Sequence, residues 1–120
     1  MTDGEIVILE AGHKLDALIA KYVFGCSNYI ETPPNVHWFS SDISEAWRIV
    51  EKLTSIEYVK VRCEVSHYHG YNCRISAPDE SQQTIPMKDA AVFAETMPLA
   101  ICQAALISLN CKKENLNDQN

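Results

Sequence analysis

Residues 59–77 read VKVRCEVSHYHGYNCRISA, and apolar and polar side chains alternate along this stretch on both sides of a short turn. A period of two is typical of β-strands that bury one face and expose the other. The turn, residues 67–70, ends in a glycine. The pattern therefore predicts an antiparallel hairpin with strands over residues 59–66 and 71–77.

Upstream of the hairpin, apolar residues recur at three- and four-residue spacing, which predicts two helices. The first covers residues 11–24 and is followed by Gly25, a natural C-cap. The second follows residues 40–42, where a serine caps it, and buries one stripe of side chains: Ile43, Ala46, Trp47, Val50 and Leu53. We expect Trp47 to lie in the core. The apolar run at residues 6–9 fits either a strand or a helix.

Downstream of the hairpin, residues 90–95 fit a strand or a helix, and we favour a third strand. Thr96 followed by Pro98 is typical of a helix start, and residues 98–109 form a helix that is apolar on nearly every side. A domain of this size has little room to enclose such a helix, so we expect it to contact a second copy of the chain. These elements predict one α+β domain over residues 1–110, with about three antiparallel strands and three helices, and a polar tail at 111–120.

The composition is acidic. The 120 residues carry 10 Lys and Arg against 16 Asp and Glu, a net charge of −6. Such a charge disfavours long nucleic acid as a partner, but a local basic cluster can still bind a small anion. We expect no secretory signal, because the first five residues are acidic rather than basic, and no apolar stretch is long enough for a membrane helix. The five cysteines are therefore expected to be free thiols in a reducing cytoplasm, without a metal or cofactor.

Three basic side chains fall on the polar faces of the predicted hairpin: Lys60, Arg62 and Arg74. Cross-strand neighbours on one face lie about 5 Å apart, so like charges there repel unless an acid or an anionic ligand compensates. One interpretation is a solvated face balanced by Glu57 and Glu64. The other is a phosphate site, since arginine suits bidentate phosphate contact.

Two further groups of residues are candidates. His67 and His69 lie close to Cys63 and Cys73 in the hairpin and could form a metal edge or simply a polar turn. The long connection at residues 26–40 is rich in rings, which either pin it to the core or form a stacking wall: Tyr29, His37, Trp38 and Phe39. Known nucleophile, phosphate-loop and metalloprotease motifs are missing from the sequence, so we expect no enzymatic activity.

Three segments resemble a known family. They are AGHKLDAL at residues 11–18 with KYVFG at 21–25, FSSDI at 39–43 leading into the second helix, and MPLAICQAAL at 97–106. In this order they resemble the phage ABA sandwich domain family over about residues 11–109. The resemblance implies an antiparallel sheet between helices, an α-β-α sandwich.

The resemblance also implies a function. Members of known role look like the phage Thoeris anti-defence sponges, oligomers that trap cyclic ADP-ribose isomers or cyclic oligonucleotides without cleaving them. Many members carry arginine where this chain has Gln103. We therefore expect a homo-oligomer, a dimer or trimer of dimers, that acts in the host cytoplasm. Its expected ligand-binding residues are Lys60, Arg62, Arg74, Phe93, Gln103 and Trp38. The alternatives are an inhibitor that binds a host defence protein and a cyclic-nucleotide phosphodiesterase with His67 and His69 in its site.

Overall fold

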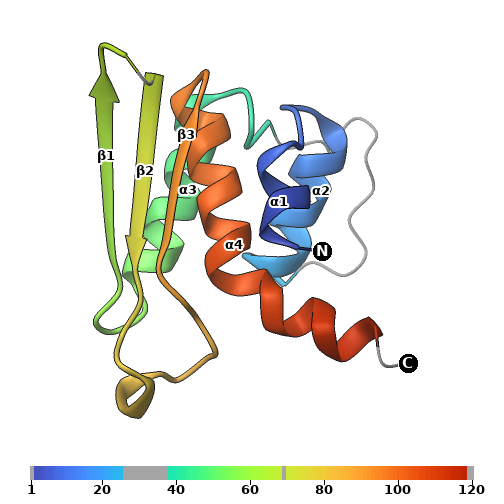
Figure 1. Ribbon diagram of the computed structural model, residues 1–120, viewed down its shortest axis with the longest axis vertical. Helices are drawn as coiled ribbons and strands as arrows, with labels where there is room; N and C mark the ends of the chain where they lie inside the picture. Colours follow the sequence, from blue (N-terminus) through green and yellow to red (C-terminus); the bar gives the residue numbers. More distant parts are fainter. Residues whose placement is uncertain (1, 26–37, 69, 119–120) are drawn as a thin grey trace.

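The computed structural model describes residues 2–25, 38–68 and 70–118, with side chains described as far as Leu109. Its elements are α1 (Asp3–Val7), α2 (His13–Tyr22), α3 (Ile43–Thr54), β1 (Lys60–Ser66), β2 (Gly70–Ser76), a 3-10 turn η1 (Glu80–Gln82), β3 (Ala90–Ala94) and α4 (Met97–Asp118) (Figure 1). The predicted α+β class with a three-stranded antiparallel sheet is confirmed.

A fourth helix, α1, accounts for the undecided run at residues 6–9. The Thr2 hydroxyl accepts the Glu5 amide, and the Glu5 carboxylate accepts the Thr2 amide, so a reciprocal capping box starts the helix. Ile6 is fully buried, whereas Val7 and Ile8 are exposed. The short helix therefore anchors itself to the core through one side chain.

The sheet has the strand order β1-β2-β3. The hairpin register pairs Arg62 with Arg74 and Cys63 with Cys73, as the alternation predicts, and β3 confirms the favoured strand. Gly70 closes the turn at a φ of 79°, where a Cβ atom would lie 2.8 Å from the Ala94 carbonyl oxygen. Only glycine fits this close approach to β3 without strain.

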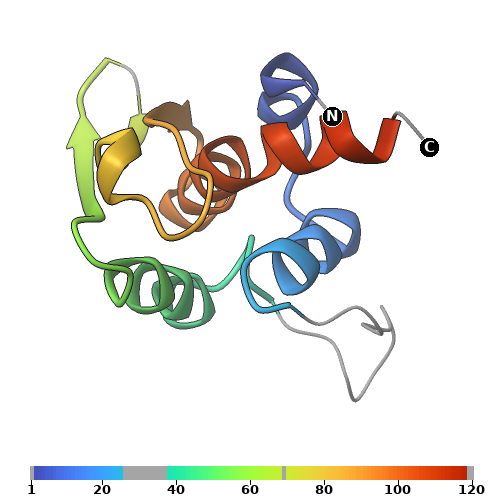
Figure 2. The same ribbon diagram turned by 90° about the horizontal axis from the view of Figure 1, so that it is seen from below.

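The helix α4 lies at the centre of the molecule. It packs on β2 and β3 on one side and on α1, α2 and α3 on the other (Figures 1 and 2). Every residue from Ala100 to Leu109 is buried within a single chain. The domain therefore does enclose the apolar helix, and the reason given above for an interface at residues 98–109 is wrong.

The start of α4 agrees with the sequence and its end does not. The Thr96 hydroxyl accepts the Leu99 amide, which confirms the predicted cap. The helix then continues to Asp118, through the segment expected to be a polar tail. Lysine, glutamate and leucine are good helix formers, so residues 112–116, four of which are polar, extend a helix that is already nucleated.

Two details of α3 differ from the expectation. Its cap is Asp42, whose carboxylate accepts the Ser44 and Glu45 amides. Ser40 is instead buried, and its amide and hydroxyl both donate to Asp16 on α2, at 2.8 and 2.7 Å. The helix is also rotated so that Ile49 is buried and Trp47 is half exposed. The expectation of a core Trp47 was wrong, because Trp47 and Ile49 lie at opposite edges of the apolar stripe.

Candidate functional site

Three predicted ligand residues lie together on the outer face of the sheet, which points away from α3 and α4. Lys60, Arg62 and Arg74 are all exposed there, and Arg62 and Arg74 stand directly opposite each other on β1 and β2. The Arg62 Nε atom lies 3.9 Å from the Glu64 carboxylate. Arg74 forms no hydrogen bond or ion pair with any residue that the structure describes. The positive charge on this face is thus only partly compensated.

An aromatic side chain extends the same face across β3. Phe93 pairs with Asn72 in the register of β2 and β3, and its ring is 53% exposed. Asn72 is buried, and its amide oxygen has no hydrogen-bond donor among the described residues. Asn72 was missed as a candidate, although its position two residues before Arg74 already placed it on the basic face.

A shallow hollow of about 290 Å³ lies beside Arg74. Ala91, the β3 residue opposite Arg74, lines it with a small side chain. Ser76 and Asp89 complete the polar part of its lining. An anion that binds Arg74 can therefore also contact the surface of the sheet within this hollow.

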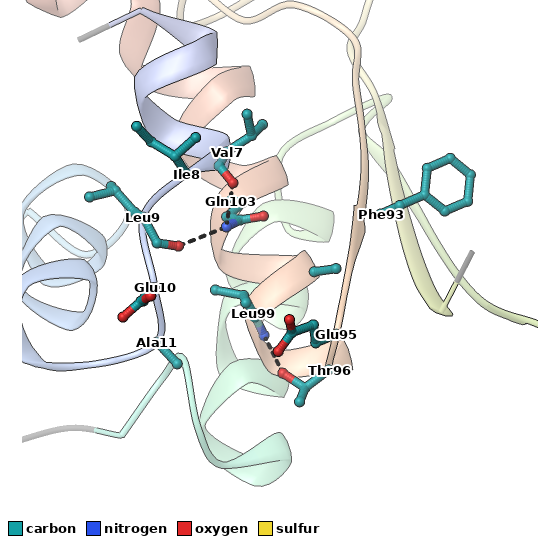
Figure 3. A pocket seen from close by; sticks show the side chains of 11 residues that line it. Val7, Ile8, Leu9, Glu10, Ala11, Phe93, Glu95, Thr96, Leu99 and Gln103 are labelled. Carbon is teal, nitrogen blue, oxygen red and sulfur yellow. Dashed lines mark hydrogen bonds between the residues drawn. The ribbon is translucent and has the colours of Figure 1, made fainter. Parts of the chain in front are cut away.

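Gln103 does not belong to this face. It lies on α4 in a cleft of about 500 Å³ between the segment Val7–Ala11 and the end of β3. Its Nε2 atom donates to the Leu9 carbonyl at 2.8 Å and to the Val7 carbonyl at 3.3 Å. Figure 3 shows the Phe93 ring pointing away from the cleft, on the other side of β3 from Gln103. Phe93 and Gln103 both line this cleft, whereas Lys60, Arg62 and Arg74, which we expected in one site with Gln103, do not.

Trp38 is separated from both regions. It precedes α3, and its half-exposed ring lies 5.3 Å from the ring of His13 on α2. The neighbouring Phe39 is buried and stacks on Phe24 at 5.2 Å, so it pins the chain to the core. Tyr29, His37 and His69 lie outside the described residues. His67 is exposed in the turn after β1, with its ring 6.4 Å from that of Tyr68, but without His69 the pair of histidines is not described.

The inner face of the sheet carries thiols rather than charges. Cys63, Cys73 and Cys102 are free. Burial raises the pKa of each of these thiols, and at Cys73 the neighbouring Cys63 adds to the effect. Among the residues that the structure describes, no group of three or more metal-ligating side chains is suited to a metal ion. These thiols therefore stay protonated at neutral pH and are poor nucleophiles.

The comparisons with known proteins agree with this fold. The sequence model of the phage ABA sandwich domain family matches residues 12–106. The chain belongs to this family. A crystal structure of a phage protein from Bacillus cereus ATCC 14579 is similar, with 29% sequence identity, a TM-score of 0.56, and coverage of 85% of this chain and 95% of that one. The match places the family domain on α2 through the middle of α4, which includes the sheet with its basic outer face.

No curated protein matches the sequence. Within the described residues, no helix of this phage-family domain is both long and apolar enough to cross a bilayer.

Proposed function

We propose that this phage ABA sandwich domain binds a cyclic nucleotide immune signal on the outer face of its sheet and sequesters it without cleavage. The observation that carries the proposal is the pair Arg62 and Arg74, held opposite each other and exposed, with Lys60 on the same strand face. Two guanidinium groups in this position can donate hydrogen bonds to one phosphodiester from both sides. A bound anion would also relieve their mutual repulsion.

The neighbouring residues suit the rest of a nucleotide. Phe93, which is half exposed, offers an aromatic surface on which a base can stack. The hollow next to Arg74 has room for the sugar or phosphate. The same face has no nucleophile poised beside a general base among the described residues. Binding alone is therefore the activity we propose, and its role would be to counter a host defence signal in the cytoplasm of the infected cell.

Assembly is part of the proposal. The outer face is open where a second α layer of a sandwich would lie, and a ligand held only by an open sheet remains largely exposed to water. A second copy across this face would enclose the ligand, as small-molecule sites usually require. Sedimentation at micromolar concentration should then show a dimer or a higher oligomer of the 13.5 kDa chain. A monomer at all concentrations would contradict this part.

The direct test is ligand release. The protein is incubated with cyclic ADP-ribose isomers or cyclic oligonucleotides, separated from free ligand, heat-denatured, and the released material is analysed by mass spectrometry. We expect intact ligand from the parent chain and at least tenfold weaker binding after Arg62→Ala or Arg74→Ala, because a charge-assisted hydrogen bond is lost. Lys52→Ala, an exposed charge on α3, is the matched control and should bind like the parent.

The same experiment separates the alternatives. Release of a cleaved product would show a phosphodiesterase, and absence of any bound nucleotide would contradict the proposal. An inhibitor of a host protein is the second candidate, favoured by the exposed apolar side chains Val65 and Phe93 at the rim of the sheet. That function would survive loss of Arg74 and fail on Phe93→Ser.

A further inference from the structure

We propose a second binding site, for a small organic cation, in the cleft between the segment Val7–Ala11 and the end of β3. Its volume of about 500 Å³ lies within the range of small-molecule sites. Lys60, Arg62 and Arg74 do not line this cleft, so its charge differs from that of the basic face, although Phe93 borders both regions.

The charges that line the cleft are of one sign. Glu10 comes from the segment after α1 and Glu95 from the end of β3, so the two carboxylates belong to opposite walls (Figure 3). No lysine, arginine or histidine lines this cleft. Both carboxylates are exposed at its edge and form no hydrogen bond or ion pair with any described residue. A ligand that enters between them therefore meets negative charge from two sides.

The floor of the cleft supplies an unused acceptor. Gln103 is 3% exposed, and its Nε2 atom is occupied by the carbonyls of Val7 and Leu9. Those two hydrogen bonds fix the orientation of the amide, so Oε1 points away from Leu9 and into the cleft (Figure 3). No donor among the described residues bonds to Oε1. An acceptor fixed in this way and open to the cleft favours a ligand that brings a donor.

Apart from Thr96, the remaining lining is apolar. Leu99 and Ala94 line the cleft on the side of α4 and β3, and Leu9 and Ala11 line it on the other side. The site therefore combines apolar walls with two carboxylates and an amide oxygen, and its best ligand is an ammonium or guanidinium group attached to a short hydrocarbon or aromatic body. The cationic head would lie between Glu10 and Glu95 and donate to Gln103 Oε1.

The test uses three probes with the same body: 2-phenylethylamine, the neutral 2-phenylethanol and the anionic 3-phenylpropionate. Binding is followed by amide chemical-shift changes in the ¹⁵N-labelled chain. We expect the amine to bind about tenfold more tightly than the alcohol, because it adds a charge-assisted hydrogen bond, and the propionate not to bind. The shifts should centre on Leu9–Ala11, Glu95 and the Gln103 side-chain amide.

Charge-removing variants locate the effect. Glu10→Gln and Glu95→Gln should each weaken amine binding about two- to fivefold, the range for an exposed ion pair. Glu51→Gln on α3 removes the same charge elsewhere and should have no effect. Gln103→Arg places a cation of the chain itself in the site and should abolish amine binding, while Arg74→Ala should leave it unchanged.

Several results would overturn the proposal. They are equal affinity for the amine and the alcohol, shifts confined to residues outside the cleft, or amine binding unaffected by both glutamate variants. Absence of any shift at millimolar amine would overturn it too. The glutamate variants lie at exposed positions, so their folding does not depend on the change and the test remains decisive if Gln103→Arg does not fold.

Discussion

The outer face of the sheet and the cleft lie on opposite sides of β3 and carry opposite charge. The first presents Lys60, Arg62 and Arg74 to solvent, whereas the second is lined by Glu10 and Glu95. The net charge of −6 describes neither region. The difference teaches that a small domain can offer two chemically distinct surfaces a single strand apart. Each surface must be tested with a ligand of the opposite charge.

The largest effect on stability is expected from a substitution in α4, which supports both the outer face of the sheet and the cleft. Leu106 on α4 is fully buried, and α4 backs the sheet and forms the floor of the cleft. Leu106→Ala should lower the free energy of unfolding by about 2–5 kcal/mol through the cavity that it leaves. Denaturant unfolding measures this, with the exposed Val65→Ala as a control expected to change stability little. A loss below about 1 kcal/mol would mean that α4 is not the common support.

Charge reversal should separate the two regions next. Arg74→Glu should weaken binding of a cyclic nucleotide at least tenfold, yet raise the free energy of unfolding by about 0.2–1 kcal/mol, because an Arg–Arg cross-strand pair becomes an Arg–Glu pair. Calorimetric titration and thermal unfolding measure the two changes. If stability and nucleotide binding fall together, Arg74 serves the fold rather than a ligand.

Binding of the amine tests the same separation from the side of the cleft. Arg74→Glu should not weaken binding of 2-phenylethylamine, since the residue lies outside the cleft. Glu95→Arg should abolish amine binding and leave nucleotide binding within about twofold of the parent, because exposed charges interact weakly at a distance. Variants that weaken both ligands equally would show one continuous site in place of two.

The dependence of stability on alkaline pH should reflect the buried thiols. Burial raises the pKa of Cys73 and Cys102 in the folded chain, so the unfolded chain loses these protons first as the pH rises. Stability is therefore fully present below the unfolded thiol pKa and declines above about pH 9, by roughly 1.4 kcal/mol per pH unit for each thiol. Unfolding at pH 8 and pH 10 measures the decline, which Cys102→Ala should reduce. A flat profile would contradict the burial of these groups.

The smallest effect on stability is expected from adding a reductant. Cys63 and Cys73 face each other across the hairpin as free thiols. Adding a reductant should leave the melting temperature unchanged, and both regions should bind as before. A drop of several degrees would reveal a disulfide between these two residues.

Local pattern was enough to predict much of the fold. The alternation in residues 59–77 predicted the hairpin and placed Arg62 and Arg74 on the polar faces of its two strands. The register that sets the two residues directly opposite each other comes from the structure. The signature Thr96 and Pro98 located the start of α4. These features depend on neighbours in the sequence, which the sequence displays directly.

Features that depend on distant contacts could not be predicted in this way. Whether residues 98–109 are enclosed depends on α1, which the four apolar residues at 6–9 did not reveal, and on how α2 and α3 pack around α4. Gln103 was expected beside the basic residues, but its bonds to Val7 and Leu9 join positions more than ninety residues apart. The rotation that exposes Trp47 also follows from the packing of α3 on α4. An apolar stripe alone does not show how two helices pack.

The central position of α4 also has a consequence for synthesis of the chain. Residues 97–109 contact every other layer of the domain, yet the ribosome makes them after α1, α2, α3 and the whole sheet. At about 5–20 residues per second, the earlier elements wait several seconds for the helix on which they pack. Until then the inner face of the sheet and the apolar sides of the three helices lack their main partner, although α3 already contacts β1. Translation that stops before residue 97 should thus yield a product without a core, which cellular proteases would remove.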